Sequence, residues 1–148
     1  MNRGGEDRAA SVRVYHDVDQ IIAHNTLTNL AFNRDRWDTD GFHDNAVNNS
    51  RLTIDEAGKY VIMAAVRWGN NGTGERLVRI LLNGVTQIVD SIINPSATIT
   101  TLNLVQTIYD LVSGDYLEVQ VRQKSTIALN VAFVAETSPE FSHVRVGP

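Results

Sequence analysis

Apolar and polar residues alternate along most of this chain with a period of two, which is typical of β-strands that bury one face. The clearest run is 116–123, in which Leu117, Val119 and Val121 are apolar and the residues between them are mostly polar. Similar runs, bounded by turn-forming residues, cover 12–15, 60–68, 75–83, 85–93, 98–111, 127–134 and 141–146. No long stretch has a helical period, so the pattern predicts an all-β sandwich of about eight to ten strands, in particular a jelly roll.

The segment 51–68 is the most informative of these runs. A short run that carries Leu52 and Ile54 is followed by a turn at 55–58 and then by a longer run, which predicts a β-hairpin. In the longer run, positions 60–66 are apolar on both faces. A strand with two apolar faces is expected at the centre of a sheet, where it is covered on both sides.

Turn-forming residues divide the second half of the chain. Asn83 and Gly84 both tolerate positive φ, so this pair predicts a second hairpin between the runs on either side of it. The polar loops 70–74, 94–98 and 123–126 are expected at the ends of the sandwich, where ligand contacts form.

Composition limits the classes of protein that fit this chain. The 148 residues are expected to form one domain over 11–148, preceded by a flexible polar lead at 1–10. The absence of cysteine excludes disulfides and thiolate zinc sites. The net charge of −4 and the lack of Lys/Arg clusters argue against nucleic-acid binding. No apolar run is long enough for membrane insertion, and the first residues contain no signal-peptide core.

Three aspartates lie close together in the polar segment 37–49. Asp38, Asp40 and Asp44, with Gly41 between them, could supply the oxygen ligands that Ca²⁺ takes on a flexible loop. The segment is not an EF-hand, because the downstream Glu and a flanking helix are absent. The alternative is a solvated turn that uses Asp and Gly for their backbone preferences. No other cofactor is predicted.

The sequence predicts no catalytic residues. Ser142, His143 and Asp115 are the residue types of a hydrolase triad, but no nucleophile elbow or flanking glycine motif accompanies them. The chain also lacks a phosphate-binding loop and a dinucleotide fingerprint. We therefore expect a protein that is not an enzyme.

Several short motifs, taken in their order along the chain, resemble the globular head domain of complement C1q and its tumour-necrosis-factor-like relatives. They are Val12–Tyr15, Phe32-Asn33, the loop Trp37–Asn49, Leu52 with Gly58-Lys59-Tyr60, Leu82–Gly84, Gly114–Val119 and Phe141–Val144. The sequence departs from the family pattern at Leu52, where an aromatic residue is usual, and at His143, where a glycine is usual. Its long loop, its lack of cysteine and its lack of a collagen-like tract make it similar to the versions found in bacteria and their viruses.

This resemblance implies a ten-stranded jelly roll that assembles as a homotrimer, and several relatives carry calcium near the top of the trimer. A trimer would also provide the second cover that a strand with two apolar faces requires. On this basis the residues expected at the subunit contact are Tyr60, Ile62, Ala64 and Phe141, or else the odd-numbered residues beside them on the strand 60–68. The alternative is a monomer in which a loop covers the second face.

Together these expectations predict a non-enzymatic trimeric module for surface display or binding. We expect it to be extracellular, as a structural or decoration component of a virion or cell surface. Three copies would present the same loops at fixed spacing, so that weak contacts add through effective concentration. The alternative is the receptor- or glycan-binding head of a fibre or adhesin. The expected partners are two further copies of the chain and a protein or glycan surface, with no nucleic acid.

Overall fold

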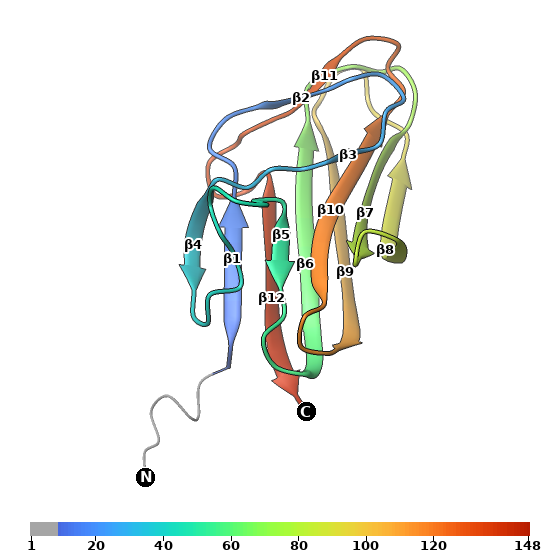
Figure 1. Ribbon diagram of the computed structural model, residues 1–148. Helices are drawn as coiled ribbons and strands as arrows, with labels where there is room; N and C mark the ends of the chain where they lie inside the picture. The colour runs from blue at the N-terminus through green and yellow to red at the C-terminus, as the bar shows by residue number, and fades with distance from the viewer. Residues whose placement is uncertain (1–8) are drawn as a thin grey trace.

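The computed structural model of the protein describes residues 9–148, which form two antiparallel β-sheets packed against each other (Figure 1). The predicted lead 1–10 lies outside the described residues except for Ala9 and Ala10. The described part contains twelve strands: β1 (Ser11–Tyr15), β2 (Gln20–Ile22), β3 (Thr28–Asn29), β4 (Arg34–Asp38), β5 (Arg51–Thr53), β6 (Gly58–Trp68), β7 (Arg76–Leu82), β8 (Thr86–Ile93), β9 (Thr101–Leu111), β10 (Tyr116–Gln123), β11 (Leu129–Val131) and β12 (Glu140–Gly147). No helix that could cross a lipid bilayer is present in this part of the chain.

The larger sheet, sheet A, has seven strands in the order β2-β11-β6-β12-β1-β4, with β9 also paired to β6. The eleven-residue β6 pairs with β12 and along its whole length with β9, while β11 pairs with its last residue, Trp68. The prediction that 60–68 forms a central strand is therefore confirmed. The smaller sheet, sheet B, has the order β3-β10-β7-β8, with β5 also paired to β10.

One of the two predicted hairpins is present. β7 and β8 pair on either side of Asn83 and Gly84, whose φ angles of 54° and 76° are those that a primed turn requires. The hairpin predicted at 55–58 is wrong, because β5 pairs with β10 in sheet B while β6 lies in sheet A. The turn at 55–58 therefore carries the chain from one sheet to the other, and Leu52 and Tyr60 enter the same core from opposite sheets.

The core lies between the two sheets and is almost entirely apolar. The inward residues predicted for β10, Leu117, Val119 and Val121, are fully buried in it. Phe32 and Phe141 pack their rings with centroids 5.4 Å apart. The alternation in sequence thus correctly assigns the buried face of β10.

Two segments differ from the sequence prediction. Trp37 and Asp38 were expected in the loop 37–49, but they are the last two residues of β4, a strand that pairs with β1. The run 127–134 contains only the three-residue strand β11. The twelve strands exceed the ten expected by two, and β2 and β3 are only three and two residues long.

Candidate functional site

The outer face of sheet A is the surface to which the assembly hypothesis points. Successive strand residues point to opposite sides, so the neighbours of core residues on β9, β6, β12 and β1 face away from sheet B. In register they form three rows across the sheet: Leu104–Ala65–Glu140–Tyr15, Gln106–Met63–Ser142–Arg13 and Ile108–Val61–Val144–Ser11. We call these twelve residues, with Trp37 on β4, the A face.

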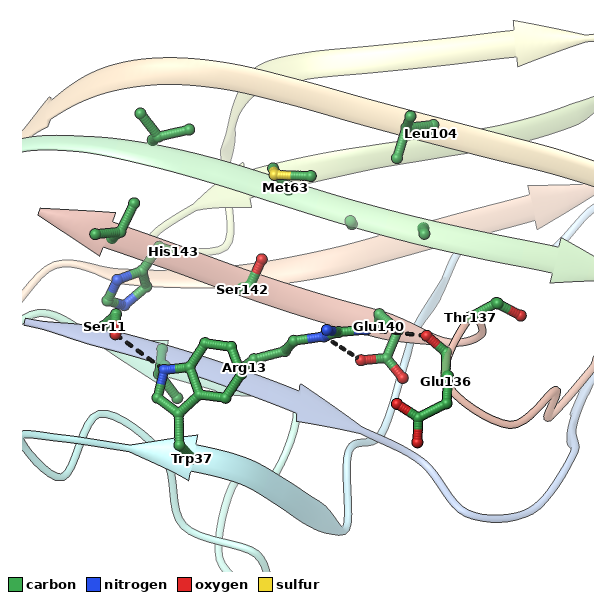
Figure 2. A pocket seen from close by; sticks show the side chains of 15 residues that line it. Ser11, Arg13, Trp37, Met63, Leu104, Glu136, Thr137, Glu140, Ser142 and His143 are labelled. Carbon is green, nitrogen blue, oxygen red and sulfur yellow. Dashed lines mark hydrogen bonds and ion pairs between the residues drawn. The ribbon is translucent and has the colours of Figure 1, made fainter. Parts of the chain in front are cut away.

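The middle of the A face is apolar and open to solvent. Met63 is 37% exposed, Leu104 is 58% exposed and Ile108 is 63% exposed. A hollow of about 550 Å³ lies over this region, between β9 and β6 on one side and Trp37 on the other (Figure 2). The apolar side chains that line the hollow include Val61, Met63, Ala65, Leu104, Val144 and Trp37. Contiguous exposed apolar surface of this kind is typical of an interaction site.

An ion network bounds the hollow at the Glu140 end (Figure 2). Glu140 accepts hydrogen bonds from Arg13 Nε at 2.7 Å, from Arg36 Nη2 at 2.8 Å and from Arg36 Nε at 3.1 Å. Glu136 accepts from Arg36 Nη1 at 3.3 Å through its carboxylate and from Arg13 Nη2 at 2.9 Å through its carbonyl. The hydrogen bond to Glu140 raises the pKa of Arg36. Two positive and two negative charges therefore balance within one protomer.

The residues named as first choice for the subunit contact are not on this face. They lie inside the core of a single protomer, each at most 1% exposed: Tyr60, Ile62, Ala64 and Phe141. That assignment is wrong, because the even-numbered side of β6 faces sheet B. The odd-numbered alternative, with Val61, Met63 and Ala65, is the set that lies on the A face, and its place in a subunit contact stays a prediction.

Three crystal structures of murine APRIL, a tumour-necrosis-factor-family jelly roll, resemble this fold. The structures at pH 8.5, pH 5.0 and pH 8.0 align with TM-scores of 0.70, 0.69 and 0.71, each at 10% sequence identity. Each alignment covers 94% of this chain and 100% of the other chain. The chain has the tumour-necrosis-factor-like jelly-roll fold. No protein-family model matches the sequence, and a search of curated proteins finds no match.

In this tumour-necrosis-factor-like fold, two of the three aspartates expected to bind calcium accept hydrogen bonds from backbone amides. Asp38 accepts hydrogen bonds at 2.9 Å from two amide nitrogens of the loop between β4 and β5. Hydrogen bonds from the amides of Val47 and Ala46 lower the pKa of Asp44. No group of three or more His, Cys, Asp or Glu side chains among residues 9–148 is placed to hold a metal ion, so Asp38, Asp40 and Asp44 do not form a ligand set.

The residues that could compose a hydrolase triad are also separate. Ser142 lies on the A face, whereas the ring of His143, the next residue, points into the core. Asp115 lies in the turn between β9 and β10, where it accepts a hydrogen bond from Asn83 Nδ2 at 2.9 Å. Neither ring nitrogen of His143 has a hydrogen-bond partner among the described residues. The three side chains therefore do not form a nucleophile–base–acid chain.

The three polar loops predicted to lie at the ends of the sandwich are neighbours in space. A Cβ atom added to Gly72 would lie 2.8 Å from Ala97 Cβ, and one added to Gly74 would lie 1.8 Å from the carbonyl oxygen of Lys124. The loops 70–74, 94–98 and 123–126 therefore touch. They lie at the end of the jelly roll opposite to the C-terminus (Figure 1).

A buried arginine, which the residue pattern did not indicate, holds one loop of this cluster in place. Arg76, fully buried at the start of β7, donates Nη2 to the carbonyl of Asn71 at 2.7 Å and Nη1 to that of Thr73 at 2.9 Å. Nη1 also lies 3.0 Å from the carbonyl oxygen of Gly74. Burial lowers the pKa of Arg76. One guanidinium thus holds successive loop carbonyls and fixes the conformation of 70–74.

Proposed function

We propose that this chain is a non-enzymatic, homotrimeric module for surface display, acting as a structural or decoration component of a virion or cell surface. The A face is the observation that carries this proposal. Its exposed apolar centre lies on the central strands of sheet A, where a loop of the same protomer would be expected to cover it in a monomer. Among the described residues no segment does so, since Met63, Leu104 and Ile108 stay exposed.

A closed ring of identical subunits would cover such a face. Each copy buries apolar area against the next, and three-fold closure leaves no unpaired apolar surface. The tumour-necrosis-factor-like fold supports this assembly by resemblance, and it supports a location outside the cell. Three identical loop clusters would then point in one direction from a compact base, which is the geometry that multivalent display requires.

Light scattering after size-exclusion chromatography tests the assembly. We expect a mass of about three times the 16.4 kDa chain mass. Met63→Glu places a charge in the middle of the A face, which should cost about 3 kcal/mol and weaken association about 100-fold. Val85→Glu, at an exposed position near the β7–β8 turn, is the matched control and should leave the trimer intact. A monomeric parent, or a Met63→Glu variant that stays trimeric, would refute the proposed contact.

A second candidate function is the receptor- or glycan-binding head of a fibre or adhesin. The cluster of loops 70–74, 94–98 and 123–126 favours it, because Arg76 fixes one of these loops in advance of any ligand. Preordered polar loops at the end far from the C-terminus would lose little conformational entropy on binding. Glycan and protein arrays probed with the parent and with Lys124→Glu would test this role. Binding that is lost in the variant supports a head, and no binding by the parent supports decoration alone.

A further inference from the structure

A histidine is enclosed in the core directly behind the A face. His143 on β12 is 2% exposed, and its ring meets Phe42 edge to face with centroids 4.4 Å apart and Tyr60 with centroids 5.0 Å apart. Both ring nitrogens are buried and have no hydrogen-bond partner among the described residues. A neutral imidazole fits this aromatic cage, whereas an imidazolium would bring a charge and two unpaired donors into it.

We propose that His143 is an acid-sensitive latch that holds the loop 39–50 against β12 while the ring is neutral and releases it when the ring is protonated. The loop is attached at this point by Phe42, which is buried against the ring. Loss of the contact between Phe42 and the ring would loosen the loop and β12, a strand that also contributes Ser142 and Val144 to the A face. The coupling from the latch to assembly rests on the proposed function, but the latch itself does not.

The groups that face the ring do not compensate for its charge. From β4, Asp38 attracts a protonated ring, but its two oxygens already accept backbone hydrogen bonds from the loop. From β6, the hydroxyl of Tyr60 donates to the carbonyl of Glu56. Burial outweighs the attraction of Asp38, so the pKa of His143 falls to about 4.

The remaining neighbours of the ring are apolar or are engaged elsewhere. Val12 on β1 and Ile62 on β6, which pair with His143 across the sheet, are both fully buried. Arg145, two residues along β12, donates hydrogen bonds to the carbonyl of Ala57 at 2.9 Å and 3.1 Å. The charged groups that act on the Tyr60 hydroxyl at the edge of the cage are Arg145, Glu56, Asp40 and Asp55. A protonated His143 ring would therefore find no free hydrogen-bond acceptor among these neighbours.

The test follows the near-ultraviolet circular dichroism of the protein from pH 7 to pH 3, together with the mass of the particle. We expect the parent to lose its aromatic signal as pH falls, and His143→Phe, which fills the cage without a titratable group, to lose it about one pH unit lower. His24→Gln, at an exposed histidine, is the control and should behave as the parent does. Equal midpoints for the parent and His143→Phe would overturn the latch.

A second measurement needs no variant. Nuclear magnetic resonance of the histidine rings should show His143 titrating near pH 4, at the pH where the signals of the loop 39–50 change. Titration of every ring near pH 6.5 with no loop change would also overturn the proposal. If the parent is a monomer at pH 7, the proposed assembly is refuted. The pH midpoints at which the parent and His143→Phe lose their aromatic signal still test the latch in that case. If His143→Phe does not fold, His143→Leu and the ring titration serve in its place.

Discussion

Asn103 is the polar side chain whose removal should damage this fold most clearly. It lies on β9 at 1% exposure, between the two sheets. Its Oδ1 accepts a hydrogen bond from Trp68 Nε1 at 2.9 Å, and its Nδ2 lies 3.0 Å from Ser91 Oγ and 3.3 Å from the carbonyls of Arg76 and Ser91. One amide therefore connects β6 and β9 in sheet A to β7 and β8 in sheet B.

Asn103→Ala would leave the indole N–H of Trp68 buried without its acceptor. A buried donor left without an acceptor destabilises the fold by about 1–3 kcal/mol. Because the hydrogen bonds to Arg76 and Ser91 are lost as well, we expect a total destabilisation of about 2–4 kcal/mol. For a chain of this length that is a fall in melting temperature of roughly 10 °C. Urea unfolding followed by far-ultraviolet circular dichroism, at one fixed protein concentration, measures the change.

Trp68→Phe provides the decisive comparison, because it removes the donor that Asn103 satisfies. In the Trp68→Phe background, Asn103→Ala should cost about 1–2 kcal/mol less than in the parent. Asn130→Ala, which removes an exposed amide bound to Asp19, is the matched control and should cost under about 0.5 kcal/mol. Strict additivity of the two core changes would refute the role of the Trp68–Asn103 bond within sheet A. A loss below about 1 kcal/mol for Asn103→Ala would show that the bonds from its amide to Arg76 and Ser91 do not hold the two sheets together.

Three further changes have expected outcomes. Gly74→Ala should lower stability by more than about 2 kcal/mol in thermal unfolding, because its φ is +71° and its new Cβ would meet the Lys124 carbonyl at 1.8 Å. Asp38→Ala should cost about 1–2 kcal/mol and speed proteolysis within 39–50, since two loop amides lose their acceptor. For His143 the folded pKa of about 4 lies below the ordinary 6.5, so the unfolded state takes the proton first. Stability should then fall by about 3 kcal/mol between pH 6.5 and pH 4, as urea unfolding against pH would show.

The sequence predicted which strands exist better than it predicted how they connect. Alternation correctly assigned the inward residues of β10 because one of its two faces is polar. The turn at 55–58 looked like a hairpin, since local turn residues report a reversal of chain direction and not whether the flanking strands share a sheet. β4 was missed because the sequence Arg-Asp-Arg-Trp-Asp is charged on both faces. At the edge of sheet A such charges stay near solvent and find partners, as Arg36 does with Glu140.

The subunit contact was assigned to the wrong side of β6 for a related reason. Both faces of 60–66 are apolar, and periodicity alone does not say which face meets sheet B. A signal was present at the ends of the strand, where Lys59 and Arg67 both fall on the odd-numbered side. Long charged residues are rarely buried in a core, so their side is the outer one. The burial of His143 follows the same alternation, since it shares a face with Phe141.

The charged groups at the edge of the A face would add little desolvation free energy if another copy covered its apolar part. Covering a surface usually requires stripping water from its charged groups, and this cost often cancels the gain from apolar contact. Here Glu140 already has only 9% of its side chain exposed, and it accepts hydrogen bonds from both Arg13 and Arg36 within one protomer. Most of its desolvation therefore occurs on folding and not on association. A second copy that covered β6 and β9 would remove mainly apolar surface from water there, so the hydrophobic gain would be opposed by little loss of hydration at Glu140.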